Sequence, residues 1–123
     1  MDEDVVSSMV AYTLKLKKFD WECCFYYDVY DRLKISLFPL NHNTEKEESS
    51  APSLYMAQKW LRETKNIHID VYRNASGWLY NLTKADNGTL IVGCKYEGPN
   101  DGGAWNTYED CLNIAIAKSL EFT

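Results

Sequence analysis

The stretch from Ser53 to Leu82 constrains the fold more than any other part of this 123-residue chain. A helix start, an apolar helical stripe, a helix stop and two strands follow one another there without interruption. Ser53 is a favourable N-cap, and apolar residues then recur at three-and-four spacing, as on the buried face of a helix. These residues are Leu54, Ala57, Trp60 and Leu61. We expect the helix to stop at Asn66.

Two strands are predicted directly after this helix. Apolar and polar residues alternate from Ile67 to Tyr72, so the sequence period changes from about 3.6 to 2 and the chain turns back as a strand. The tetrapeptide Asn-Ala-Ser-Gly at 74–77 has the composition of a turn. It leads into a second strand through Trp78 and Tyr80.

The region before this stretch reads as a helix, a hairpin and a loop. Helical spacing between acidic residues at one end and lysines at the other predicts a helix over 3–18. Alternation over 23–30 and again over 33–37 predicts a β-hairpin whose second strand ends at Pro39. Residues 41–52 are polar and have no large apolar side chain, so we expect a mobile loop there.

The region after it supplies one more strand, a flexible loop and a helix. Leu90, Ile91 and Val92 predict a strand within 89–96. The segment 97–106 holds three of the six glycines and reads as a flexible loop. A capping-box-type start at Thr107 precedes an apolar helical stripe that runs to the C-terminus.

These elements predict an α+β fold in the order α-β-β-α-β-β-β-α. Short turns between consecutive strands favour a mainly antiparallel sheet, expected here as one twisted sheet with helices packed on one face. The length predicts a single domain over 1–123, with an α-β-β-β-α part at 53–123. The residues expected to be buried together in its core are Trp60, Leu61, Ile67, Ile69, Leu112 and Ile116.

Charge and composition narrow the function classes. The net charge of −5 and the pI near 5.0 disfavour non-specific binding to phosphate backbones and anionic membranes. The acidic start of the chain is the opposite of a signal peptide, and no apolar run of membrane-spanning length occurs, so we expect a cytoplasmic protein with reduced cysteines. No zinc spacing appears among its four cysteines and two histidines, and the sequence predicts no cofactor and no metal.

Catalytic patterns are weak. His68 and Asp70 share one face of a predicted strand. The carboxylate could orient the imidazole as a general base for Cys94 or Cys111. A histidine on the solvent side of a strand is far more often simply exposed, and the chain has no nucleophile elbow or phosphate loop. Cys23 and the cysteine after it point to opposite faces of a strand, which favours packing over redox chemistry. The sequence therefore predicts no catalytic residue.

The second half invites a different interpretation. Its α-β-β-β-α order is that of a double-stranded RNA-binding domain, so an RNA-binding or antitoxin-like module is the alternative function. Such domains grip phosphates with a basic start to the last helix, whereas this helix starts with Glu109 and Asp110. The charge therefore argues against the alternative that the topology suggests.

The chain carries several distinctive short motifs. They are Ala-Pro-Ser-Leu at 51–54, Ala-Gln-Lys-Trp-Leu-Arg-Glu at 57–63, Asn-Ile-His-Ile at 66–69, Gly-Trp-Leu-Tyr at 77–80 and Thr-Tyr-Glu-Asp at 107–110. These motifs resemble those of a group of small proteins from gut Bacteroides-type bacteria and their phages or mobile elements. The run from Leu14 to Trp21 is similar in kind, while Met56 and the apolar 113–116 depart from the group. The resemblance implies a bacterial or phage origin and no activity, because the group has no assigned function.

The chain is rich in aromatic residues, with nine tyrosines and four tryptophans. Tyrosine and tryptophan are enriched at contact surfaces. Ile114 should point away from the core of the last helix, and it lies near Trp105 and Tyr108 in sequence. These three residues are the predicted partner contact. The predicted function is a non-enzymatic binding or accessory protein that acts through protein–protein contact with an unknown partner or as a homodimer.

Overall fold

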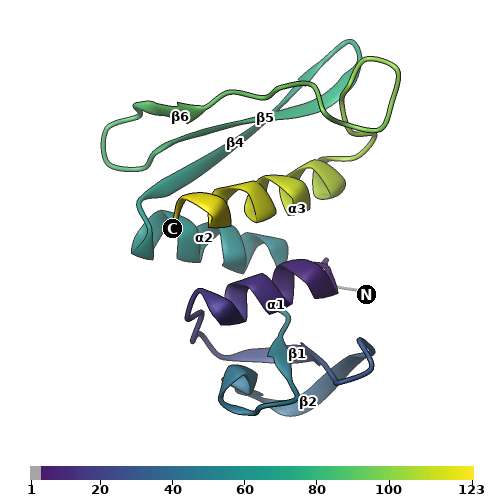
Figure 1. Cartoon of the computed structure of the whole chain (residues 1–123), viewed down its shortest axis with the longest axis vertical. Helices are drawn as coiled ribbons and strands as arrows, with labels where there is room; N and C mark the ends of the chain where they lie inside the picture. The colour runs from purple at the N-terminus through teal and green to yellow at the C-terminus, as the bar shows by residue number, and fades with distance from the viewer. Residues whose placement is uncertain (1–3) are drawn as a thin grey trace. The chain divides into compact units, whose positions relative to one another are not determined.

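The computed structural model describes residues 4–123, which divide into two compact units at 57/58, within helix α2 (Leu54–Thr64) (Figure 1). The α+β class and the predicted order of elements are confirmed, with one additional short strand, β3 (Ser49–Ser50). The prediction of one sheet is wrong, because the strands form two three-stranded antiparallel sheets. Single-domain organisation stays a prediction.

The first helix, α1, is shorter than the sequence predicts. It spans Ser8–Leu16, and the Ser7 hydroxyl caps it by accepting a hydrogen bond from the backbone N–H of Val10. Val6 instead donates its N–H to the carbonyl of Pro52, 3.0 Å away, so the preceding backbone is extended and paired. The predicted start at residue 3 lies outside the described residues.

The sheet of the first unit has the strand order β2-β1-β3. Its strands are β1 (Cys23–Tyr27), β2 (Leu33–Leu40) and β3 (Ser49–Ser50), and a 3₁₀ turn, η1 (His42–Thr44), precedes β3. α1 packs beside β3. The segment 41–52 therefore holds a 3₁₀ turn and a strand, which corrects its prediction as a loop, and β2 continues one residue past Pro39.

The second unit follows the sequence prediction closely. Helix α2 (Leu54–Thr64) begins where Ser53 accepts a hydrogen bond from the Met56 N–H, and it ends before Asn66, whose φ of 57° breaks the helical path. Its sheet has the order β4-β5-β6. The strands are β4 (Ile67–Asn74), β5 (Gly77–Lys84) and β6 (Leu90–Val92), the last shorter than predicted.

Helix α3 (Tyr108–Ser119) covers one face of this second sheet, packing on β4 and β5 (Figure 1). Thr107 caps it by accepting from the Asp110 N–H at 3.0 Å, as the sequence predicts, and η2 (Leu120–Phe122) follows. All six residues expected in the core are buried. Within residues 4–123, no helix has both the length and the apolar character needed to cross a membrane.

Candidate functional site

The turn between β1 and β2 is built around one carboxylate. Asp28 accepts hydrogen bonds from the backbone N–H groups of Tyr30 and Arg32, both at 2.9 Å, and from the Arg32 Nε at 3.1 Å. These bonds, the backbone N–H of Arg32 first, hold the pKa of Asp28 below its ordinary value. The Arg32 guanidinium also lies over the Tyr30 ring, 5.0 Å from its centroid. Asp28 and Arg32 are therefore engaged with each other, whereas Asp31, the third charged residue of the turn, is exposed.

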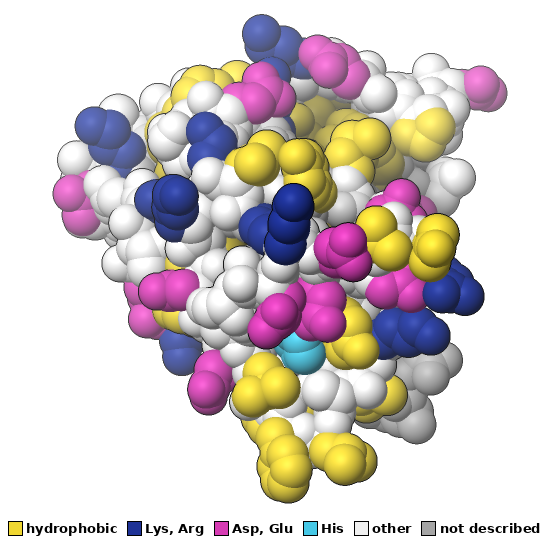
Figure 2. Space-filling view, turned by 60° about the horizontal axis from the view of Figure 1, so that its bottom comes forward, with side chains coloured by type: hydrophobic (Ala, Val, Ile, Leu, Met, Phe, Trp, Pro, Cys, Tyr) yellow, Lys and Arg dark blue, Asp and Glu magenta, His cyan; other side chains and the backbone are white. Residues whose placement is uncertain are grey.

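Strand β2 is an edge strand whose large apolar side chains are in water. Leu37 is 94% exposed, Phe38 71% and Ile35 67%. Together with the apolar residues of the turn they form what we call the hairpin surface. It consists of Val29, Tyr30, Leu33, Ile35, Leu37, Phe38 and Leu40. Figure 2 shows hydrophobic side chains projecting together at the bottom of the view.

A bulge in β2 carries two of these side chains, including the most exposed one. Cys23 pairs with Leu40 and Phe25 with Ile35, so four residues, 36–39, lie opposite Cys24 alone. Extra residues on one strand interrupt the ladder and bend the strand outward. The bulge carries Leu37 and Phe38, and the ladder resumes at Leu40.

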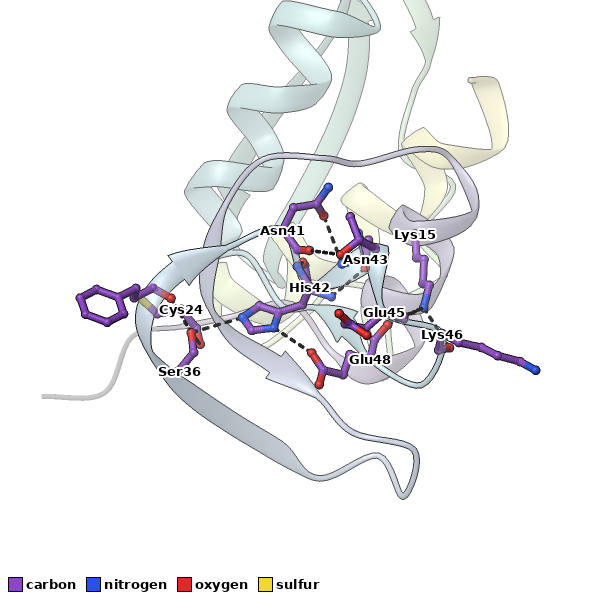
Figure 3. A network of polar contacts seen from close by, with 12 residues as sticks. Lys15, Cys24, Ser36, Asn41, His42, Asn43, Glu45, Lys46 and Glu48 are labelled. Carbon is purple, nitrogen blue, oxygen red and sulfur yellow. Dashed lines mark hydrogen bonds and ion pairs between the residues drawn. The ribbon is translucent and has the colours of Figure 1, made fainter.

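A polar network centred on His42 holds the start of this bulge (Figure 3). The buried imidazole stacks on the Tyr26 ring, with centroids 4.2 Å apart. Its Nδ1 lies 2.9 Å from a carboxylate oxygen of Glu48, and its Nε2 lies 3.3 Å from the Ser36 hydroxyl. That hydroxyl also lies 2.6 Å from the carbonyl of Phe38 and 3.1 Å from that of Cys24. Ser36 therefore joins both sides of the bulge to His42.

Lys15 anchors the loop that carries Glu48. Its ammonium donates to the backbone carbonyls of Glu45, Lys46 and Glu48 at 2.7, 3.1 and 2.5 Å (Figure 3). An ammonium has three donors, and three carbonyls from one loop satisfy all of them. Helix α1 thereby anchors the loop, and the loop presents its carboxylate to His42.

Two further polar side chains complete the order of the segment 41–52. Asn43 donates from its amide to the Phe19 carbonyl at 2.8 Å and accepts from the Ser50 N–H at 2.8 Å. The buried Ser50 hydroxyl accepts from the backbone N–H of His42 at 3.0 Å. Hydrogen bonds thus provide the order that the missing apolar side chains cannot.

An open pocket of about 550 Å³ lies beside the network, with Tyr26, Ser36, His42 and Glu48 among its lining residues. Ser36, His42 and Glu48 contact one another in the order hydroxyl, imidazole, carboxylate, as in the catalytic triad of a hydrolase. A triad serine, however, must give its proton to the imidazole, and the Ser36 hydroxyl is much closer to the Phe38 carbonyl. One hydroxyl has one proton, so this arrangement works as a clamp on the bulge.

His42 was not among the predicted site residues, because it lies in a segment interpreted as a loop. The available signal was the density of side chains that hydrogen-bond to nearby backbone, namely Asn41, Asn43, Ser49 and Ser50. Such residues order a short polar segment when a buried partner is present. Within residues 4–123, no three His, Cys, Asp or Glu side chains gather as a metal site would require.

The histidine that the sequence did single out lies in a different setting. His68 is half-buried on β4, opposite Thr83 of β5, and Asp70 is exposed. Cys111 is fully buried, and burial raises the pKa of its thiol to about 12. A thiol with that pKa stays protonated near neutral pH and is a poor nucleophile. All four cysteines are free thiols.

The predicted partner contact is only partly exposed. Trp105 exchanges backbone hydrogen bonds of 2.8 and 3.0 Å with Trp78, and its side chain is only 7% exposed. The pairing requires Gly77, whose φ is +142° and at which a Cβ would lie 2.6 Å from the Trp105 carbonyl oxygen. Tyr108 is half-buried with its ring edge against Trp78, 5.3 Å between centroids. Ile114 is 40% exposed, so it faces away from the core as predicted.

The Trp105 side chain is therefore buried, and the partner contact at these three residues stays a prediction. The glycine-rich loop does not extend into solvent around it, but folds back and pairs with the start of β5. The Trp105 ring lies 5.7 Å from that of Tyr80, so these aromatic residues pack against each other.

The chain is thus an α+β protein whose most prominent external feature is an apolar edge strand. Comparisons with protein-family models, with curated proteins and with solved structures found no match for it.

Proposed function

We propose that this protein is a non-enzymatic binding or accessory protein that acts through protein–protein contact at the hairpin surface. The observation that carries the proposal is the exposure of seven large apolar side chains on one hairpin. Soluble monomers rarely keep large contiguous apolar patches in water unless the patch is used. The contact thereby moves from the predicted Trp105, Tyr108 and Ile114 to β2.

The chemistry of the surface supports binding over catalysis. The hairpin surface is apolar and convex, whereas sites for small substrates are concave with a few convergent polar groups. The adjoining pocket has polar groups, but its serine is hydrogen-bonded to a backbone carbonyl. The polar network therefore serves the surface by holding the bulge in place.

The origin and location proposed for the protein rest on the sequence. The resemblance to small proteins of gut Bacteroides-type bacteria and their phages supports a bacterial, phage or mobile-element origin. The net charge of −5, which repels anionic membranes, supports a cytoplasmic location.

An RNA-binding or antitoxin-like module at 53–123 is the alternative, and one observation favours it. The second unit has an antiparallel sheet, β4-β5-β6, with α3 on one face, the arrangement that the α-β-β-β-α order suggests. Charge opposes it, because Glu109 and Asp110 occupy the first turn of α3. Gel shifts with duplex RNA at low salt test this alternative, and a shift that weakens as salt rises would support it.

Co-purification from the cell that encodes the protein tests the main proposal, using three tagged forms. These are the wild type, Leu37→Asp and the control Ile114→Asp, which places the same charge on an exposed residue of α3. We expect a protein bound in stoichiometric amount to the wild type and the control, and lost from Leu37→Asp. The same set of proteins on all three forms would contradict a contact at the hairpin surface, and RNA alone would favour the alternative.

A further inference from the structure

We propose that the hairpin surface binds a second copy of this chain, an inference that rests on the proposed function and names its partner. Two hairpin surfaces then face each other across a two-fold axis near Leu37. The most exposed side chain of the bulge would become the most buried one of the interface.

The size of the surface fits a dimer. At on the order of 150 Å² per free side chain, the low end of the range for aromatic residues, the exposed fractions of these seven give roughly 700 Å² as the most that one copy can bury. That is about what each partner contributes to a standard-size stable interface. One hairpin surface therefore supplies one side of such an interface without any other part of the unit.

The charge pattern suits a surface that meets itself. A two-fold axis places like charges close together, so a self-binding patch must keep charges off its centre. Within β2, Lys34 is the one charged side chain, and alternation directs it to the opposite face from Leu33 and Ile35. Arg32 is paired with Asp28 at 3.1 Å. Asp31 is exposed, but it lies in the turn and outside β2. The apolar residues of β2 therefore offer no ion pair to an acidic or basic partner and fit a second apolar copy.

The bulge determines how two copies meet. An exposed edge strand can add strands without limit, and natural edges prevent this with bulges, lysine and proline. Strand β2 has all three, in the bulge at 36–39, Lys34 and Pro39. Proline also removes one N–H from the ladder. The two copies therefore pack through side chains. A two-fold contact uses the same surface on both copies, which closes the assembly at two.

The bulge is held in shape before binding. The Ser36 hydroxyl donates to the Phe38 carbonyl at 2.6 Å and lies 3.1 Å from that of Cys24, and His42 lies between Ser36 and Glu48. Fixing the backbone in advance lowers the entropic cost of ordering it at an interface. Leu37 and Phe38 are thus presented by a shaped segment of backbone.

Light scattering after size exclusion, from micromolar to near-millimolar protein, tests the inference. The variant is Leu37→Asp, and the matched control is Leu90→Asp, another exposed leucine at 60% exposure on β6. We expect a dimer mass for the wild type and the control, and a dissociation constant raised roughly 30-fold or more in Leu37→Asp, as for a residue at the centre of an interface. Circular dichroism checks that each variant keeps its fold.

Two results would overturn it. A wild type that stays monomeric at every concentration excludes the second copy, and equal dissociation of both variants excludes the hairpin surface as the interface. Leu37-dependent capture of a different protein by a monomeric wild type would end this inference while the proposed function survives. If the wild type shows neither self-association nor Leu37-dependent capture of another protein, the inference and the proposed function are both excluded.

Discussion

The two sheets differ in what covers them, although both are three-stranded, antiparallel and built from alternating apolar residues. In the second unit, the central strand β5 buries Leu79, Tyr80 and Leu82, and α3 packs on it. In the first unit, β2 leaves nearly every side chain exposed. Alternation therefore predicts to which face of a strand a side chain points, but does not predict whether that face is covered.

The difference follows from the segments available as cover. Helix α3 brings an apolar stripe that includes Leu112 and Ile116, so it can exclude water from a sheet. The segment 41–52 beside β2 has hydrogen-bonding side chains but no large apolar one. It can therefore be ordered by His42 and Asn43, but it has too little apolar area to cover β2. The apolar residues of β2 remain in water for that reason.

The largest expected contrast is in the free energy of unfolding, between truncation of a buried leucine of α3 and truncation of an exposed leucine of β2. Leu112→Ala, in the covered region, should lower the free energy of unfolding by about 2–5 kcal/mol because it leaves a cavity. Leu37→Ala should change it by less than about 0.5 kcal/mol, since that side chain is in water. Urea denaturation at low protein concentration measures both. Comparable losses would mean that Leu37 is packed, which would remove the basis of the hairpin surface.

Removing the three hydrogen bonds of the Lys15 ammonium, which we call the lysine clip, should produce the next largest effect, confined to the first unit. Lys15→Met leaves three carbonyls without their ammonium and should cost about 1.5–3 kcal/mol, the range for hydrogen bonds to a charged group. Lys46→Met is the matched control. It removes one positive charge, as Lys15→Met does, but leaves the Lys46 carbonyl bonded to Lys15. Amide hydrogen exchange should show faster exchange at Ser50 in Lys15→Met alone. Unchanged protection there would show that the loop is ordered without the clip.

Local signals explain why the second unit could be predicted from sequence. The caps at Ser53 and Thr107, and the stop at Asn66, each act within three or four residues of themselves. The helical stripe and the strand alternation determined which residues enter the core, and all six are buried. These features need no knowledge of distant partners.

The supporting network could not be predicted in the same way. Ser36, His42 and Glu48 are joined by side-chain contacts across a bulge, and neither a helical nor a strand period relates them. The burial of Trp105 could not be predicted either, because its pairing with Trp78 spans a loop whose path the sequence does not specify. In both cases the deciding contact is made by the tertiary fold.

Alkaline pH should weaken the covered region through Cys111. Burial raises the pKa of its thiol from 9.0 to about 12, so the folded protein keeps the proton that the unfolded chain releases. Its contribution is full below pH 9 and is lost as pH rises toward 12, by roughly 1 kcal/mol per pH unit. Unfolding free energies measured across this range should fall less steeply in Cys111→Ala than in the wild type. Parallel slopes would contradict a buried, protonated thiol.

Acid should act on the uncovered region, with the smallest effect of the four. The pKa of Asp28 is held below its ordinary 3.8 by the N–H of Arg32 and by further hydrogen bonds, so its ionised form stabilises the turn. That contribution is present above pH 3.8 and is lost as pH falls through the lower folded value. The amide signals of Tyr30 and Arg32 should therefore shift together below pH 3.8 in an NMR titration, because both donate to this carboxylate. Asp28→Asn should abolish the shared shift, whereas Asp31→Asn, which removes the same charge from the same turn, should leave it. A shared shift that persists in Asp28→Asn would assign the turn's acid response to another group.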